Sequence, residues 1–259
     1  MTASPLSLTD PCQTMLYSWQ MNPELNPPKQ FTAKFEEKIE FNDKFAEYHF
    51  ELTEPHEIGF KSGQYVSIQI DDAGHRRSYS ITSSPATQHG IELLIDRSPG
   101  GIGSQYLDNL KFGDSIRGIG PMGQFVLAGK GEEALVFIAT GSGIAPMRSM
   151  ILDLLQVRQD QREIVLYWGM RNANDLFWLD EFQGLVEQLP NFHFYPTLSQ
   201  PHPEWTLSTG RVTDLVLAHE FRPATGFYLC GRANMIQDVS KILTEKGVSP
   251  TNIHVEKFF

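Results

Sequence analysis

The chain carries a strand, a glycine turn and a helix start in direct succession at residues 134–150, ALVFIATGSGIAPMRSM. Residues 135–139 are continuously apolar, and the run is short enough for a parallel strand covered on both faces. The turn with Thr140, Gly141 and Gly143 cannot continue this strand, and Pro146 follows where the first turn of a helix tolerates proline. Backbone N–H groups at the positive end of such a helix can hold a phosphate.

This turn departs from the usual dinucleotide fingerprint, G-x-G-x-x-G with an acidic residue about 20 residues later. Pro146 occupies the place of the third glycine, and the next expected strand runs into Met170-Arg171-Asn172 without an acid. The pattern therefore disfavours a standard NAD-dehydrogenase Rossmann domain. A strand–helix turn that binds nothing fits the same residues, so the rest of the chain must decide.

The second half of the chain alternates strands with helices from residue 133 onward. We expect strands at 135–139, 164–168, 192–197, 227–229 and 253–255, and helices at 146–159, 175–189, 211–218 and 233–246. Such alternation predicts a parallel sheet with helices on both faces. Gly247 follows the last of these helices, where glycine is a good C-terminal stop.

The first half reads instead as short strands separated by turn residues. We expect them at 31–41, 45–52, 65–70, 77–82, 91–96, 115–119 and 124–127, with one helical turn from about Gly101 to Leu110. This spacing predicts a small antiparallel barrel of the Greek-key type. The predicted organisation of the 259 residues is thus an N-terminal arm (1–30), a β-barrel domain (31–130) and an α/β domain (131–259).

Charge and cysteine content exclude several classes of function. The net charge of −10 and the pI of 5.2 argue against non-specific nucleic-acid binding, which needs a basic surface. Cys12 and Cys230 can neither form a disulfide framework nor supply the four thiolates of an iron–sulfur cluster. No basic, then apolar leader opens the chain, and no run approaches the roughly 18 apolar residues of a membrane span. We expect a soluble, cytoplasmic protein.

Three short motifs carry candidate chemistry. In a strand, Arg77 and Tyr79 share one face, where the arginine suits a phosphate and the tyrosine a flat ring; an edge strand with a solvated arginine fits equally well. The run from Gly100 to Ser104 opens a helical turn with N–H donors, although a flexible hairpin loop is the alternative. Cys230 ends a strand at the same sheet edge as the first glycine turn, where α/β sheets bind ligands, yet a lone buried cysteine is usually only a small apolar residue.

Taken in order, the motifs resemble the ferredoxin–NADP reductase family over about residues 31–259. They are Arg77-x-Tyr79-Ser80, Gly100-Gly101-x-x-Ser104, Gly120-Pro121-x-Gly123-x-Phe125, Gly141-x-Gly143-Ile144-Ala145-Pro146, Gly169-x-Arg171…Asp175-Leu176, Cys230-Gly231 and the end Val255-Glu256-Lys257-Phe258-Phe259. From the residues alone, the run Gly120-Pro121-Met122-Gly123-Gln124-Phe125 is a tight turn that leads into a strand.

The resemblance implies that the barrel binds FAD. Arg77 would contact the pyrophosphate, Tyr79 would pack along the isoalloxazine and Ser80 would hydrogen-bond near flavin N5. Gly100, Gly101 and Ser104 would cradle the phosphates.

The resemblance likewise implies a nicotinamide nucleotide on the second half, with Gly141–Pro146 under its pyrophosphate and Cys230 beside the nicotinamide. Thr140 and Gly231 are further candidate cofactor-binding residues. Phe258 or Phe259 would cover the flavin, and Glu256 would be a proton or charge partner. Ser80, Cys230 and Glu256 are thus the candidate catalytic residues. Hydride would pass from nicotinamide C4 to flavin N5 and electrons would leave singly, with no need for a metal or a nucleophile.

Departures from the family pattern refine this reading. Without cysteines for an iron–sulfur domain, electrons must pass to a separate protein (a ferredoxin, a rubredoxin or an oxygenase component) or to a diffusible acceptor. Arg232 stands where the family usually has proline. The donor is NADH or NADPH: Arg171 and Arg211 suit a 2′-phosphate, whereas Gln200, where NADPH-specific relatives often place arginine, favours NADH.

Two alternative functions stay open at this point. One is a flavin reductase of the same fold that uses free flavin as its substrate. The other is a non-catalytic subunit that docks within a larger redox complex. Its signature would be loss of Arg77, Ser80 or the 141–146 loop, and all of these are present.

Overall fold

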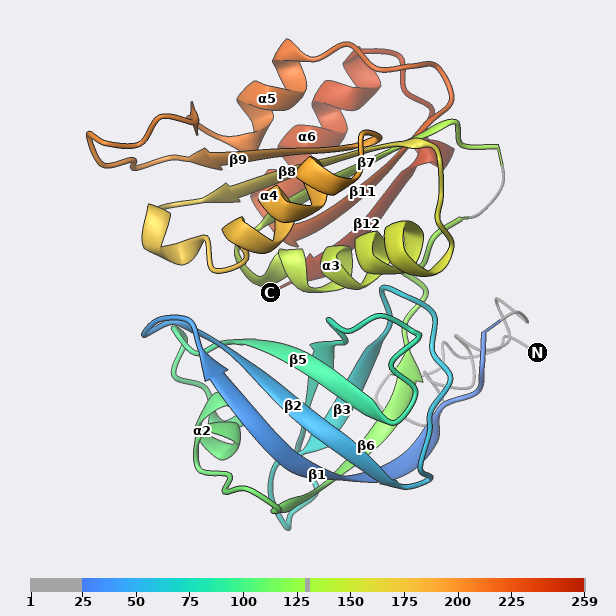
Figure 1. Ribbon diagram of the computed structural model, residues 1–259, viewed down its shortest axis with the longest axis vertical. Helices are drawn as coiled ribbons and strands as arrows, with labels where there is room; N and C mark the ends of the chain where they lie inside the picture. Colours follow the sequence, from blue (N-terminus) through green and yellow to red (C-terminus); the bar gives the residue numbers. More distant parts are fainter. Residues whose placement is uncertain (1–24, 129–130, 259) are drawn as a thin grey trace, which may run out of the picture.

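The computed structural model describes residues 25–128 and 131–258, with only the backbone described for Phe258. These residues form two sheets that lie one above the other along the long axis (Figure 1). The first sheet is antiparallel and the second is parallel. The predicted fold class, a barrel followed by an α/β domain, is confirmed.

Six antiparallel strands build the first sheet, in the order β4-β3-β6-β1-β2-β5. They are β1 (Lys29–Glu40), β2 (Phe45–Glu54), β3 (Tyr65–Gln69), β4 (Arg76–Ser80), β5 (Gly90–Asp96) and β6 (Ser115–Met122). A bridge between Ile81 and Leu93 connects the two outer strands, so the barrel is nearly closed. The β2–β3 and β5–β6 connections join strands that are not neighbours, as in a Greek key.

Alternation along the strands fills the barrel with apolar side chains. In β1, Phe31, Ala33 and Phe35 are buried while Lys34 between them is exposed, because successive side chains point to opposite faces. The helical turn predicted near Gly101 is α2 (Ile102–Asp108), which lies between β5 and β6 in the chain.

The second sheet has the order β10-β9-β8-β7-β11-β12, and every neighbouring pair is parallel. Its strands are β7 (Ala134–Thr140), β8 (Glu163–Met170), β9 (Phe192–Leu198), β10 (Ser208–Thr209), β11 (Thr225–Arg232) and β12 (Ile253–Phe258). From β7 the chain builds outward through β8, β9 and β10, then crosses to the other side of β7 for β11 and β12. The order therefore reverses between β7 and β11.

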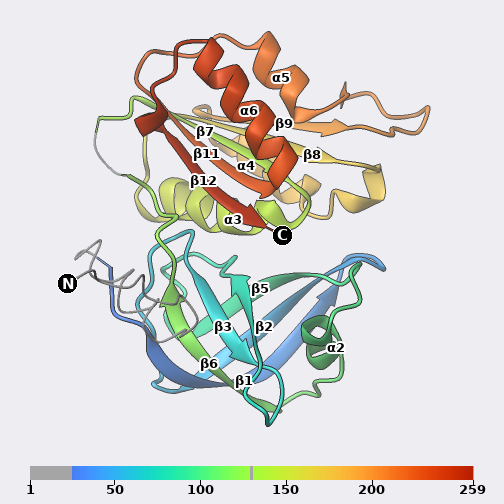
Figure 2. The same ribbon diagram turned by 180° about the vertical axis from the view of Figure 1, so that it is seen from behind.

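Helices cover both faces of this sheet, as predicted (Figures 1 and 2). They are α3 (Ile144–Leu152), α4 (Leu179–Gln188), α5 (Val212–Ala218) and α6 (Ala233–Glu245). Leu135 and Phe137 of β7 belong to one apolar core with α3 and α4, whereas Val136 and Ile138 belong to another with α5 and α6. Both faces of β7 are thus buried, which explains its continuous apolar sequence.

A largely buried arginine joins the two sheets. Arg148 of α3 is 14% exposed, and its guanidinium ion-pairs with Glu92 of β5 at 2.9 Å and with Glu181 of α4 at 3.0 Å. It also donates to the carbonyl oxygen of Thr82 at 3.3 Å. Nearby, the Ser149 hydroxyl donates to a barrel carbonyl at 2.7 Å. Helix α3 therefore holds the α/β domain against the barrel at a fixed place.

Two local predictions in the barrel are wrong. Residues 124–127 form no strand, because Phe125 leaves the barrel and packs against Tyr228 of β11 with ring centroids 6.1 Å apart. The run 120–125, predicted as a tight turn into a strand, begins instead within β6, which continues to Met122 and pairs Gly120 with Lys29; the chain leaves the strand at Gly123, whose φ is +99°. In both places contacts with distant parts of the chain override the local signal.

The α/β domain differs from prediction mainly at element ends. The helix expected at 146–159 begins with a 3₁₀ turn, η1 (Gly141–Gly143), continues as α3 and ends in a π-helical turn, η2 (Asp153–Val157). The helix expected at 175–189 is confined to α4, and the short strand β10 was not predicted.

Some predictions fall outside the described residues. They concern residues 1–24 of the N-terminal arm, part of the boundary at 129–131, and the aromatic side chains of Phe258 and Phe259. The domain limits therefore stay predictions. In the part of the chain that is described, no helix combines the length and hydrophobicity of a membrane span.

Candidate functional site

The two glycine motifs of the α/β domain meet where the strand order reverses. β7 and β11 are neighbours, and Cys230 pairs with Ala139 just before the first glycine turn. Gly143 packs directly on the other motif: a Cβ there would overlap the carbonyl oxygen of Cys230 and lie 2.6 Å from its carbonyl carbon. Open α/β sheets bind ligands at such a reversal, beyond the carboxyl ends of the strands.

This edge leaves room and hydrogen-bonding groups for a ligand. Gly141 has φ +58°, and a Cβ built on it meets nothing within 4 Å, so its surroundings are open. The Oγ1 atom of Thr140 is buried without a hydrogen-bond partner among the described residues. Gly231, with φ +145°, lies against this hydroxyl, because a Cβ there would overlap it. These residues form a small cradle with an unsatisfied hydroxyl.

The helical run that follows adds backbone donors to the cradle. η1 leads directly into α3, so the first N–H groups after Thr140 have no intrahelical partner. Pro146 is the third residue of α3 and falls in its first turn, as predicted. The arrangement suits an anion or a phosphate.

Glu256 of β12 lies between the sheet and the barrel. It pairs in register with Cys230. Burial raises the pKa of Glu256 to about 7, and no described group donates a hydrogen bond to its Oε2 atom. Burial raises the pKa of Tyr65 in β3, and the charge of Glu256 raises it further. This carboxyl is therefore close enough to both domains to act on groups bound between them.

The thiol of Cys230 is buried rather than presented at a surface. The residue is 0% exposed, and burial, followed by the charge of Glu256, raises the thiol pKa well above its usual value. A neutral buried thiol is a poor nucleophile. Cys230 can shape a site by contact, and covalent chemistry at its sulfur is disfavoured.

On the barrel, Arg77 and Tyr79 lie beside the start of α2. Gly103 of this helix packs so closely on them that a Cβ would overlap the tyrosine hydroxyl and lie 2.7 Å from Cγ of Arg77. Arg77 is exposed, whereas Tyr79 is half-buried and burial raises its pKa to about 12. Strand β4 and the amino end of α2 thus bring a guanidinium, a phenol ring and backbone N–H donors together.

The other predicted barrel residues surround this point. Gly100, with φ +61°, and Gly101 have open space where a Cβ would stand. The Ser104 hydroxyl donates to the Gly101 carbonyl at 2.9 Å, which leaves its lone pairs as acceptors. Ser80 is buried and pairs across the sheet with Tyr65. The charge of Glu256 contributes to the raised pKa of this tyrosine. Ser80 therefore lies at the end of the barrel that faces the α/β domain.

Arg171 and Arg211 lie on neighbouring loops of the carboxyl edge. Arg171 follows β8, and Gln200 follows β9. The backbone N–H of Gln200 donates to the backbone carbonyl of Arg171 at 2.9 Å. Arg211 follows β10 and is the N-cap of α5, where its own amide donates to Asp214 at 2.7 Å. Both side chains are exposed. Arg171 follows β8, the neighbour of β7, whereas Arg211 follows β10 at the outer edge of the sheet.

Sequence reasoning missed two residues of this region, Tyr65 and Arg148. Tyr65 is indicated only by its strand pairing with Ser80. The acidic partners of Arg148 come from three separate elements, so no local pattern indicates them; they are Glu47, Glu92 and Glu181. Gly103 lies within the predicted run from Gly100 to Ser104, and the structure adds its close approach to Tyr79.

The residues at the barrel and at the sheet edge fit the two groups that the sequence motifs indicate, FAD and a nicotinamide nucleotide. Open glycines beside Arg77 and the start of α2 leave space for a diphosphate on the barrel. The unsatisfied Thr140 hydroxyl and Glu256 carboxyl can pair with the amide of a nicotinamide at the sheet edge. No metal ligand is required by this donor set.

Comparisons with known proteins agree with this division. A family model described as "Oxidoreductase FAD-binding domain" matches residues 32–127, and one described as "Oxidoreductase NAD-binding domain" matches 137–241. The phenol hydroxylase P5 protein of Acinetobacter pittii is 36% identical over 206 residues, which cover 78% of this chain and 58% of that protein. The reductase component of phenol 2-monooxygenase from Pseudomonas sp. is 31% identical over 239 residues, 90% of this chain and 67% of that one.

Among solved structures, the cytochrome P450 reductase of Amycolatopsis superposes with a TM-score of 0.81 at 31% identity. The match covers 90% of this chain and 70% of that one. The chain thus spans roughly three-fifths to two-thirds of the curated relatives named above. Two domain matches in the expected order, together with these relatives, establish that the chain belongs to the ferredoxin–NADP reductase family of FAD-dependent NAD(P)H oxidoreductases.

Proposed function

We propose that this chain is the reductase component of an oxygenase system, which takes a hydride from NADH and passes electrons singly to a separate oxygenase protein. The observation that carries the proposal is the position of Glu256, which is paired with Cys230 and whose charge, after burial, raises the pKa of Tyr65 in the barrel. It places the carboxyl edge of the α/β domain against the end of β3 and β4. Hydride transfer between two bound rings needs such a contact between the domains.

The proposed roles of the residues follow from this contact. Arg77 and the 100–104 turn hold the diphosphate of FAD, and Tyr79 packs on its ring system. Ser80 supplies a hydroxyl at the buried end of β4. FAD, when bound, supplies the conversion of a two-electron donor into single electrons. The protein contributes the orientation of the rings and a site closed to water.

On the α/β side, the 141–146 loop binds the nucleotide diphosphate and Thr140 pairs with the carboxamide. Cys230 and Gly231 provide the surface on which the nicotinamide lies. Glu256, whose pKa is about 7, holds a proton at pH 6 and has lost most of it at pH 8. Phe258 and Phe259 are proposed as the aromatic cover of the flavin from the family resemblance alone.

The electron acceptor is proposed from the relatives. One is named the reductase component of phenol 2-monooxygenase and another the reductase subunit of an aromatic O-demethylase. These names support a separate acceptor protein, which we therefore propose. We place this reaction in the cytoplasm.

NADH is the proposed donor, and Gln200 is the residue that supports this choice. Arg171 and Arg211 are both exposed on separate loops. If they read a 2′-phosphate, Arg171→Ala and Arg211→Ala will weaken NADPH binding more than NADH binding. If NADH is the donor, both variants will keep the NADH reaction within about two-fold.

An absorbance spectrum of the purified protein, followed by anaerobic addition of each nucleotide, tests the reductase. We expect a yellow protein that NADH bleaches faster than NADPH. FAD that stays bound through gel filtration supports a resident cofactor, whereas flavin lost at that step favours a free-flavin reductase. Colourless protein that takes up no FAD and oxidises neither nucleotide would refute both and favour a docking subunit. NADH-dependent hydroxylation after mixing with a purified phenol 2-monooxygenase oxygenase component tests the acceptor.

A further inference from the structure

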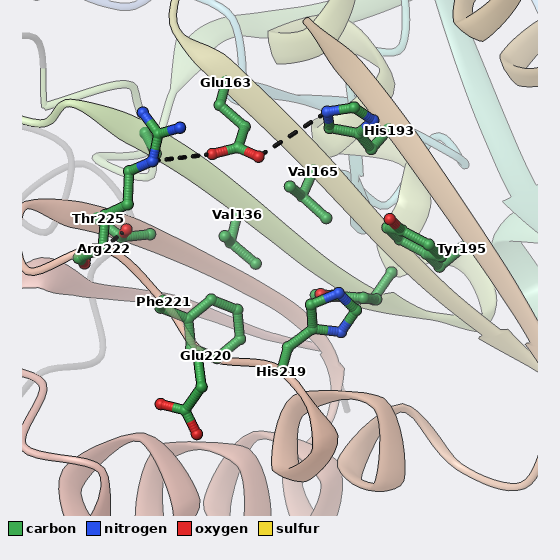
Figure 3. Close-up of a pocket in the computed structure, with 12 residues that line it drawn as sticks. Val136, Glu163, Val165, His193, Tyr195, His219, Glu220, Phe221, Arg222 and Thr225 are labelled. Carbon is green, nitrogen blue, oxygen red and sulfur yellow. Dashed lines mark hydrogen bonds and ion pairs between the residues drawn. The ribbon is translucent and has the colours of Figure 1, made fainter.

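The two faces of β8 have different surroundings. Val165 and Tyr167 line a cavity of about 380 Å³, together with residues of β7, β9 and the loop after α5 (Figure 3). Trp168 follows Tyr167 and points to the opposite face, into the core that β7 shares with α3 and α4. Its side chain is 0% exposed. An indole N–H buried in this way needs an acceptor inside the protein.

The acceptor of this N–H belongs to the glycine turn after β7. The Nε1 atom of Trp168 donates to the carbonyl oxygen of Gly141 at 3.3 Å. The indole reaches this carbonyl because Trp168 pairs in register with Ala139, two residues before the glycine. The backbone N–H of Ile144, at the start of α3, donates to the same carbonyl. The first residue of the candidate nucleotide loop is thus held by one donor from β8 and one from α3.

Gly141 depends on these bonds for its orientation. It has no side chain to pack, its φ is +58°, and a Cβ built on it meets nothing within 4 Å. Glycine has wide conformational freedom, so a carbonyl with fixed partners limits the rotation of its peptide plane. The peptide between Gly141 and Ser142 is trans, and its N–H therefore points away from its C=O. With the carbonyl turned to the indole, the Ser142 N–H is directed away from it and joins the donors at the start of η1.

Aromatic rings from both domains hold the indole itself. Phe177 and Phe182 contact it edge-on, with ring centroids 5.1 and 6.2 Å from its own. Phe177 also lies against two rings of the barrel, those of Phe41 and Phe45, each with its centroid 4.9 Å away. Rings packed on several sides restrict the rotamers open to the indole. The position of the Gly141 carbonyl is thereby tied to that of the barrel.

We propose that Trp168 is a positioning residue for nucleotide binding. Its indole N–H sets the orientation of the peptide between Gly141 and Ser142, so that the loop presents N–H donors to the diphosphate of the nicotinamide nucleotide. Trp168 acts through the loop, since its own side chain is fully buried. The inference rests on the proposed binding of this diphosphate by the 141–146 loop. A loop that is ordered beforehand binds more tightly, because less conformational freedom is lost on binding.

Binding of ADP-ribose, which carries the diphosphate without the nicotinamide, tests the proposal on the flavin-loaded protein. Trp168→Phe keeps an aromatic ring and removes the N–H. We expect the Kd from a ¹⁵N NMR titration to rise about five-fold, the effect of one hydrogen bond. In the wild type, the indole N–H signal of Trp168 should shift as ADP-ribose saturates the site. Phe192→Leu is the control, because Phe192 is buried in the same core at the amino end of β9; it should lower the stability and leave the Kd unchanged.

Kinetics with two hydride donors separates positioning from a general loss of packing. With NADH, Trp168→Phe should raise the KM about five-fold and keep kcat within about two-fold, because the lost contact acts on diphosphate binding. With 1-benzyl-1,4-dihydronicotinamide, a donor that has no phosphate, the rate constant of flavin reduction should stay within about two-fold. 3-Benzothienylalanine at position 168 keeps the fused rings and removes only the N–H. It should reproduce the change in Kd, and it decides the question should Trp168→Phe fail to fold.

Two results would overturn the positioning role of Trp168. One is a Kd for ADP-ribose and a KM for NADH that equal those of the wild type in the variants at position 168. The other is an equal loss with the phosphate-free donor or in Phe192→Leu, which would show an effect of packing alone. A wild-type protein that neither binds ADP-ribose nor is reduced by NADH would instead refute the proposed function, and this inference with it.

Discussion

Glu256 should make the stability of this protein fall as the pH rises. Its folded-state pKa is about 7, compared with an ordinary value of 4.5, because the carboxyl is buried. Between these values the folded chain keeps a proton that the unfolded chain has released. Stability therefore decreases from pH 4.5 upward until the pH passes 7. The full effect is about 3 kcal/mol, since each pKa unit corresponds to about 1.36 kcal/mol.

Glu256→Gln keeps the size of the side chain and removes its ionisation. Integrated between pH 5 and pH 8, the linkage predicts that the variant gains about 2.5 kcal/mol relative to the wild type. Urea unfolding of both proteins at pH 5, 6, 7 and 8, with the same excess of FAD, measures this difference. Glu245→Gln is the control, because its side chain is 63% exposed and should show no comparable change.

A constant difference between Glu256→Gln and the wild type across this pH range would refute the reasoning. It would mean that the carboxyl ionises with an ordinary pKa, and hence that it is not buried between the two domains. A direct carboxyl titration by ¹³C NMR would then give a value near 4.5.

Three further outcomes follow from contacts described above. Gly143→Ala should destabilise the protein by about 1–3 kcal/mol and raise the KM for NADH, because the new Cβ overlaps the Cys230 carbonyl. Gly184→Ala, in the open middle of α4, is its control and should be neutral or stabilising in the same urea unfolding. Arg148→Met should cost about 3 kcal/mol, because it leaves the buried carboxylate of Glu47 and the partly buried ones of Glu92 and Glu181 without their cation, and a loss below about 1 kcal/mol would contradict that role. In a Cys12→Ser background, iodoacetamide at pH 8 should label Cys230 at least about ten-fold more slowly in the folded than in the unfolded chain, and equal rates would show that the thiol is accessible.

The order of elements was predictable because most of them carry a complete local signal. β7 is apolar on both faces, and the glycines and Pro146 after it mark the turn and the helix start. β1 alternates buried and exposed residues. Such patterns involve only residues that are close together in the sequence, so they can be recognised without knowledge of the fold.

Where prediction failed, the deciding contact lies far away in the sequence. Phe125 reads as part of a strand, but its ring packs on Tyr228, about a hundred residues later. The pairing of Tyr65 with Ser80 and the approach of Glu256 to Tyr65 need the register of both sheets. The cavity that alternate residues of β7, β8 and β9 line has the same origin, because no single segment of the sequence shows it.

The three neighbouring residues Ala139, Cys230 and Glu256 stand in one row across β7, β11 and β12. The register between neighbouring strands sets which residue of each strand stands in this row. The chemistry of the row therefore depends on the register as much as on the identity of the residues. One residue added to or removed from η4 (Pro250–Asn252), just before β12, would bring Val255 or Lys257 into the row in place of the carboxyl. This protein should therefore tolerate a substitution in β12 far better than an insertion or deletion in the turn that precedes it.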